Sequence, residues 1–129
     1  MKRHVDLLGT LYLIWGALNL VVSLAMLALS FASLAIAGSA TSGEPGARIA
    51  ASFLAGLFLT LSVLGLLWGA VHLWGAFALQ RGRDWARAIG IVLGILDLVV
   101  LPFGTALGAY GLWVLTHRDV RAAFAPERP

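Results

Sequence analysis

The fold depends on the stretch from Trp85 to His117, which reads WARAIGIVLGILDLVVLPFGTALGAYGLWVLTH. From position 88 to position 116 it contains one charged residue, Asp97, and one proline, Pro102. In hydrocarbon an ionised carboxylate is costly, and a proline leaves backbone groups that need other partners. The stretch therefore raises two questions: whether it crosses a membrane once or twice, and which residue is the partner of Asp97.

The composition of the whole chain is typical of an integral membrane protein. Of its 129 residues, 60% are hydrophobic and 12% are charged, and the mean hydropathy is +0.93. A soluble domain usually carries about 25% charged residues. We attribute the net charge of +3 to anchoring at the cytoplasmic face, with contacts to anionic lipid, and we expect no binding of nucleic acid. Because the chain has no cysteine, disulfides, thiolate metal sites and cysteine nucleophiles are excluded.

The first half of the chain predicts two long helices, at about 5–37 and 47–79, joined by a polar outer loop at 38–46. At ~1.5 Å per residue each helix is about 50 Å long, which exceeds the ~30 Å thickness of the hydrocarbon core. We therefore expect these helices to tilt or to extend beyond the bilayer. The first run is also much longer than the ~7–15 apolar residues of a signal peptide, so we interpret it as a retained transmembrane helix.

The basic residues decide how often the Trp85–His117 stretch crosses the membrane. If it forms a hairpin of two short helices, at about 86–101 and 103–116, with a turn at Leu101–Gly104, the chain crosses four times. Both termini then lie on the side of the 80–87 turn, and that side holds eight of the nine bases. A single crossing would place part of the tail, 117–129, outside and would spoil this bias. The sequence therefore predicts an all-α four-helix bundle in one transmembrane domain, 1–129, with cytoplasmic termini.

Three of the predicted helices carry a polar residue three positions after a glycine: Asn19, His72 and Asp97. Positions separated by three, four and seven residues lie on one helix face, and glycines on such a face allow close packing of helices in a membrane. We therefore predict an inward-facing polar cluster of these three residues. Packing is predicted through Gly16, Gly65, Gly69, Gly90, Gly94, Gly104 and Gly108, and the hairpin turn through Pro102 and Gly104. These three glycine–polar segments have two alternative origins, an internal duplication or chance in a sequence rich in glycine and leucine.

The predicted cluster allows two interpretations. Asp97 and His72 could form a proton relay or an ion-coupling site. Alternatively the three polar residues could only hold helices together, at about 1 kcal/mol per hydrogen bond, and we favour this structural interpretation. No cofactor and no metal are predicted, because one His, one Asp and one Asn are too few for a closed zinc shell. No catalytic residues are predicted either, and Ser23, Ser30, Ser33, Ser52 and Ser62 are expected to bond the backbone of their own helix.

Aromatic residues near the helix ends predict an interfacial belt. Trp85, Trp113, Tyr12 and Trp74 are expected to anchor at the cytoplasmic face, and Phe124 in the tail is expected to face lipid.

The second half of the chain resembles a known family. Arg83-Asp84-Trp85-Ala86-Arg87 and the later stretch LPFGTALGAYGLWVL, residues 101–115, are similar to sequences of small bacterial four-span membrane proteins, most of them uncharacterised. The resemblance covers the first half only in its hydrophobic pattern. It implies a bacterial inner membrane and the four-span topology, and it supplies neither an activity nor catalytic residues.

Two classes of function agree with these features. The first is a structural or accessory subunit that packs through its glycine faces, in a homo-oligomer or in a larger membrane complex. The alternative is a small transporter or channel with His72, Asp97 and Asn19 in a proton- or ion-coupled pathway. We favour the first and do not expect an enzyme.

Overall fold

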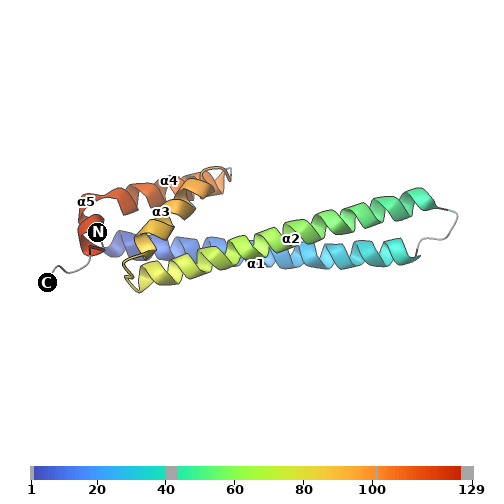
Figure 1. Cartoon of the computed structure of the whole chain (residues 1–129), viewed down its shortest axis with the longest axis horizontal. Coiled ribbons are helices and arrows are strands. Elements are labelled where there is room, and N and C mark those ends of the chain that lie inside the picture. Colours follow the sequence, from blue (N-terminus) through green and yellow to red (C-terminus); the bar gives the residue numbers. More distant parts are fainter. Residues whose placement is uncertain (1, 40–43, 101, 126–129) are drawn as a thin grey trace. The chain divides into compact units, whose positions relative to one another are not determined.

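A computed structural model describes residues 2–39, 44–100 and 102–125, and within these ranges the chain is helical with no β-strand (Figure 1). The helices are α1 (Lys2–Ser39), α2 (Pro45–Gln80), α3 (Ala86–Asp97), α4 (Phe103–Thr116) and α5 (Arg118–Ala123). The chain divides into two compact units. We call Ala17–Ala70 the hairpin unit, and Met1–Gly16 with Val71–Pro129 the terminal unit.

The two long predicted helices are confirmed, and both extend slightly beyond the predicted ends. α1 has 38 residues and α2 has 36, which at ~1.5 Å per residue correspond to about 57 and 54 Å. Pro45 is the first residue of α2, a position where the missing backbone N–H of proline costs nothing. Of the predicted loop 38–46, residues 40–43 lie outside the described residues.

By length and composition α1 and α2 could each cross a membrane. Only 22% and 17% of their most apolar segments are buried within the structure. The buried core helix of a soluble protein would hide most of such a segment. The all-helical class is therefore established, together with two long apolar helices whose surfaces are largely uncovered.

In the hairpin unit α1 and α2 meet along a seam of small side chains. The buried positions recur at spacings of three, four and seven residues, so they lie on one face of each helix. They are Ser23, Ser30, Ser33 and Ala37 on α1, and Ala51, Ala55, Ser62 and Gly69 on α2. Gly65 belongs to the same seam, because a side chain there would overlap the Ser23 hydroxyl. The seam follows the heptad spacing of coiled coils, with small residues in place of large apolar ones.

Two serines of this seam bond the opposite helix, which corrects the prediction that they bond their own. Ser62 Oγ donates to the Ser23 carbonyl at 2.8 Å, and Ser30 Oγ donates to the Ala55 carbonyl at 2.9 Å. The small neighbours bring the two backbones close enough for a short hydroxyl group to reach across. Ser23 behaves as predicted, and its Oγ donates to the Asn19 carbonyl of its own helix at 2.7 Å.

In the terminal unit α3 and α4 form a helical hairpin, but α3 ends at Asp97 and not near residue 101. The chain leaves the helix in a turn in which the Val100 N–H donates to the Asp97 carbonyl at 2.9 Å. The Thr105 hydroxyl then donates to the Leu98 carbonyl at 3.0 Å and satisfies a backbone group that the early end of the helix leaves free. Pro102 directly precedes α4, and Leu101 lies outside the described residues.

Glycines bring the backbones of α3 and α4 into contact. A Cβ atom at Gly108 would overlap the Gly94 carbonyl oxygen and would lie 3.1 Å from the Leu98 nitrogen. At Gly104 a Cβ atom would lie 2.7 Å from the Asp97 carbonyl oxygen. At the ends of α3 and α4 that lie away from the turn, Arg87 links the two helices. Its Nε donates to the Leu115 carbonyl near the end of α4 at 2.8 Å. A cation at this position also complements the negative end of the helix dipole.

α5 closes the core of the terminal unit. Val120 and Phe124 are buried, so the prediction that Phe124 faces lipid is wrong. The short helix, predicted only as a turn, folds back and places the Phe124 ring on apolar side chains of the unit. The core comprises Val5, Leu8, Tyr12, Ala76, Ala78, Leu79, Ala86, Leu93, Val114, Leu115, Val120 and Phe124.

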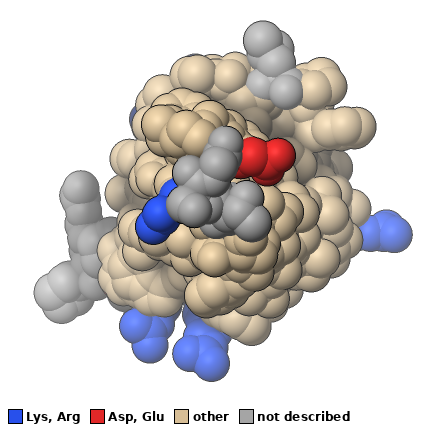
Figure 2. Space-filling view, turned by 90° about the vertical axis from the view of Figure 1, so that its right-hand side faces the viewer, with Lys and Arg blue, Asp and Glu red and all other residues tan. Residues whose placement is uncertain are grey.

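The outward surfaces of both units are dominated by large apolar side chains. In the hairpin unit Phe31, Ile49 and Phe53 are 64%, 70% and 71% exposed, and in the terminal unit Val99 and Phe103 are 81% and 73% exposed. On the face in Figure 2, residues other than Lys, Arg, Asp and Glu form most of the visible surface. The hairpin unit thus has small residues in its seam, the terminal unit has an apolar core around the buried His72 and Asp97, and both have large apolar residues outside.

Candidate functional site

The centre of the terminal unit holds a buried pair of ionisable side chains. His72 Nε2 lies 3.1 Å from Oδ1 and 3.0 Å from Oδ2 of Asp97, and both side chains are fully buried. A proton on Nε2 is therefore donated to the carboxylate. Two of the three predicted cluster residues are in direct contact, although 25 positions separate them in the sequence.

Three backbone features place Asp97 against His72. Asp97 is the last residue of α3, and its side chain lies beside Gly108 of α4, where a Cβ atom would come within 3.3 Å of the Asp97 Cβ. Glycine at position 108 therefore leaves room for the carboxylate. On α2, Gly75 is one turn after His72, and Leu93 of α3 fills the space beside it. Glycines on α2 and α4 thus set how closely α3 approaches.

Tyr12 is a third member of the site, and its role was missed in the sequence. Its ring packs edge-on against the His72 ring, with 5.5 Å between centroids and an interplanar angle of 87°. Its hydroxyl donates to the Gly90 carbonyl at 3.2 Å, and the side chain is fully buried. The prediction that Tyr12 is an interfacial anchor is therefore wrong, because this residue joins α1 to the centre of the unit.

The sequence did contain a signal for Tyr12. It lies three positions after Gly9 and four before Gly16, so it shares the glycine face of α1. Its hydroxyl lies in a pocket made by glycines, since Cβ atoms at Gly94 and Gly111 would come within 3.5 and 2.8 Å of it. A side chain at Gly111 would overlap the tyrosine hydroxyl, so glycine at this position of α4 leaves the space that Tyr12 fills.

Asn19, the third predicted member, belongs to the hairpin unit, where its carbonyl accepts the bond from Ser23. Its place in a polar cluster with His72 and Asp97 stays a prediction. Of the predicted packing glycines, Gly90, Gly94, Gly104 and Gly108 line contacts of the terminal unit, and Gly65 lies in the seam of the hairpin unit. Gly16 and Gly69 are buried.

The remaining predicted anchors are aromatic residues at the charged end of the terminal unit. Trp74 and Trp113 are 55% and 53% exposed, and Trp85 is half-buried. Trp74 and Trp85 stack, with 4.8 Å between ring centroids and 30° between ring planes. Trp113 lies near two histidines, with 5.9 Å between its ring centroid and that of His4 and 6.2 Å to that of His117.

The site is suited to holding or sharing a proton. An imidazole and a carboxylate at 3.0 Å can exchange one proton between them, and the Tyr12 ring packs against the imidazole in a T-shaped arrangement. Among the described residues no group of three or more His, Cys, Asp or Glu side chains could hold a metal ion. Two cavities of the terminal unit, of about 250 and 120 Å³, are lined by neither His72 nor Asp97.

Comparison with known proteins gave no match: no family model fits the sequence, and no curated protein and no solved structure is significantly similar to it.

Proposed function

We propose that this chain is a four-span protein of a bacterial inner membrane that serves as a structural or accessory subunit. The observation that carries the proposal is the large exposed apolar surface. Large apolar residues such as Phe31 and Phe53 are outside, whereas serines and alanines form the seam of the hairpin unit and the His72–Asp97 pair is buried in the terminal unit. In water this surface would be costly, at ~25 cal/mol per Å² of exposed apolar area, whereas hydrocarbon solvates it well.

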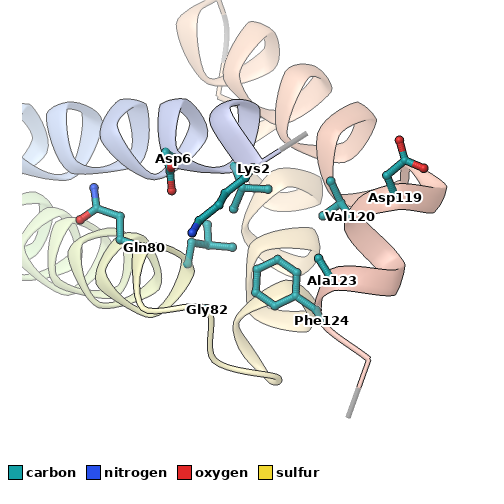
Figure 3. A pocket seen from close by; sticks show the side chains of 10 residues that line it. Lys2, Asp6, Gln80, Gly82, Asp119, Val120, Ala123 and Phe124 are labelled. Atoms are coloured by element: carbon teal, nitrogen blue, oxygen red, sulfur yellow. The ribbon is translucent and has the colours of Figure 1, made fainter. Parts of the chain in front are cut away.

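Basic residues at one end of the terminal unit support cytoplasmic termini. Lys2 of α1, Gly82 of the α2–α3 turn and Asp119 of α5 line one cavity, so the N-terminal residues, this turn and α5 lie together (Figure 3). These segments carry Lys2, Arg3, Arg81, Arg83, Arg87, Arg118 and Arg121. Such a concentration of bases is typical of a cytoplasmic face.

The position of the polar pair fits a transmembrane site. His72 lies eight residues before the end of α2, and Asp97 lies eleven residues after the start of α3. At ~1.5 Å per residue they are about 12 and 16 Å from the charged end, near the middle of a ~30 Å hydrocarbon layer. There a paired carboxylate and imidazole cost far less than either group alone.

A packing role is supported by the hydrogen bonds of the buried polar groups, most of which link one helix to another. His72 and Asp97 contact each other, Tyr12 bonds a backbone carbonyl, and Ser30 and Ser62 bond the opposite helix. Most of the glycines that were predicted to mediate packing already contact another helix of this chain. Gly56 of α2 instead has no atom within 4 Å of an added Cβ. This open position is suited to the close approach of another transmembrane helix.

The test is the mass and the membrane behaviour of the purified protein. We expect it to float with liposomes after reconstitution and to resist extraction with alkaline carbonate. In mild detergent we expect light scattering to give a mass above that of one chain, and Gly56→Leu to reduce that mass to the monomer. A monomeric wild type, or a Gly56→Leu variant that keeps the full mass, contradicts packing through this position.

A proton- or ion-coupled transporter is the second candidate, because the His72–Asp97 pair is fully buried and close to the centre of the proposed spans. Asp97→Asn separates the two proposals, since an amide keeps a hydrogen-bond acceptor but carries no titratable proton. Proteoliposomes with a pH-sensitive dye inside would report proton flux under an imposed gradient. Flux that is present in wild type and lost in Asp97→Asn favours transport, and equal flux in both favours the structural role.

A further inference from the structure

A small cleft at the charged end of the terminal unit combines two arginines with stacked tryptophans. It has a volume of about 120 Å³ and is lined by Trp74, Phe77, Ala78, Arg81, Arg83 and Trp85. The Arg83 guanidinium carbon lies 5.6 Å from the centroid of the Trp85 ring, which in turn stacks on Trp74. The cleft thus has a flat aromatic wall with a cation held over it.

A glycine turn sets the positions of both arginines. Gly82 has φ +62°, the left-handed conformation that glycine adopts without strain. The Gly82 N–H donates to the Leu79 carbonyl at 3.1 Å, and the Arg83 N–H donates to the Ala78 carbonyl at 3.2 Å. These two bonds form a Schellman motif, which fixes the direction of the chain after a helix. Arg81 and Arg83 are consequently held on the two sides of a fixed turn beside α2.

The charge of the cleft favours an anion. Arg81 and Arg83 are exposed, and neither lies within 4 Å of an acidic oxygen in the described part of the chain. The cavity of about 250 Å³ in this unit differs, because two acidic residues, Asp6 and Asp119, line it together with Lys2 (Figure 3). Guanidinium groups match phosphate oxygens with paired hydrogen bonds. A volume of 120 Å³ is below the ~300 Å³ of a pocket for a drug-sized molecule, so the cleft suits one phosphate with its ester atoms.

We propose that this cleft binds the phosphate of an anionic phospholipid, with Arg81 and Arg83 on its oxygens and Trp74 and Trp85 against its glycerol. Trp74 and Phe77 are 55% and 48% exposed on the outward face of α2, where acyl chains would pass. The inference rests on the proposed membrane location. It adds a particular headgroup site to the general attraction between bases and lipid.

The experiment measures lipid binding to the intact protein in detergent by native mass spectrometry. The probes are phosphatidylglycerol and phosphatidylcholine of the same acyl chains. At ~1 kcal/mol per arginine near anionic lipid, two arginines correspond to about a 30-fold preference for phosphatidylglycerol. We expect Arg81→Gln with Arg83→Gln to remove most of this preference. We expect Arg81→Lys with Arg83→Lys to keep only part of it, because lysine lacks the paired geometry.

The matched control removes the same charge elsewhere at the same end. Arg118→Gln with Arg121→Gln on α5 should leave the preference within about twofold of wild type. A wild type without preference, or equal losses in the two Gln variants, overturns the proposal, because only general surface charge would then act. Displacement of phosphatidylglycerol by millimolar inorganic phosphate would also overturn it and would indicate a site for free phosphate. Flotation with liposomes separates these outcomes from a failure of the membrane proposal itself.

Discussion

At the scale of single residues, the terminal unit is held together by specific contacts of three buried side chains, Tyr12, His72 and Asp97. Asp97 is fully buried and has His72 at 3.0 Å, and Tyr12 covers the imidazole while bonding Gly90. Removing His72 leaves the Asp97 side chain buried without its imidazole partner, whereas removing both side chains also removes that buried carboxyl group. Comparing the single and double variants therefore distinguishes a pair whose only role is to satisfy two buried polar groups from a pair with a further function.

The first prediction concerns the pair. His72→Leu should lower the free energy of unfolding in detergent by about 3–5 kcal/mol, because an unpaired carboxylate stays buried. His72→Leu with Asp97→Leu should recover most of that loss and come within about 1 kcal/mol of wild type. The measurement is unfolding in a denaturing detergent, monitored by circular dichroism. If the double variant is as unstable as the single variant, the His72–Asp97 pair contributes more to stability than the hydrogen bonding of two buried polar groups.

The second prediction concerns Tyr12. Tyr12→Phe removes only the hydroxyl that donates to Gly90, so the loss should be about 1 kcal/mol, a typical value for a hydrogen bond between membrane helices. Tyr110→Phe is the matched control, because its hydroxyl contacts the exposed His4 at 3.2 Å. That control should change stability by less than about 0.5 kcal/mol. Equal effects of the two variants would contradict a special role for Tyr12.

At the scale of the helices, the spacing of glycines determines which segments touch. Gly94 and Gly108 bring the α3 and α4 backbones together, and the serine seam does the same for α1 and α2. Helices in hydrocarbon gain little from apolar burial, so close packing and hydrogen bonds must hold them together. Positions with a glycine in contact should therefore be far more sensitive to an added methyl group than open ones.

The third prediction compares two glycines in helices. Gly108→Ala should destabilise the protein by about 1–3 kcal/mol, because the new Cβ overlaps the Gly94 carbonyl and pushes α3 from α4. Gly38→Ala on α1 adds the same atom in open space, and it should be neutral or stabilising by up to about 1 kcal/mol, since alanine favours a helix. Thermal unfolding in detergent measures both. Similar melting temperatures for the two variants would contradict the close backbone contact between α3 and α4.

The sequence predicted the elements better than their contacts. Glycine spacing was enough to place His72 and Asp97 on inward faces, because helical periodicity is a local property. It could not identify Tyr12 as their neighbour, since composition made an aromatic near a helix end resemble an interfacial anchor. The burial of Phe124 and the bonds of Ser30 and Ser62 to the opposite helix depend on distances between helices, which no single segment encodes.

For the whole molecule, charge and apolar surface together support the proposed orientation. The terminal unit carries Lys2, the arginines of the α2–α3 turn and those of α5 at one end, and Arg48 lies in the hairpin unit near the start of α2. α3 and α4 span only about 18 and 21 Å at ~1.5 Å per residue, which is short for a helix that crosses ~30 Å. In the proposed topology α1 and α2 each cross the membrane and the chain reverses between α3 and α4, so both termini would lie on one side whether α3 and α4 cross fully or only enter the membrane.

The last prediction tests that orientation, and the absence of native cysteine makes it direct. Ser39→Cys at the end of α1 should react with a membrane-impermeant maleimide added to intact spheroplasts, because this end is proposed to face the periplasm. Ala122→Cys on the exposed surface of α5 should react only after permeabilisation. Denatured samples provide the reference for full labelling at each position. Labelling of Ala122→Cys in intact spheroplasts would place the C-terminal helix outside, and it would rule out an even number of crossings with a cytoplasmic N-terminus.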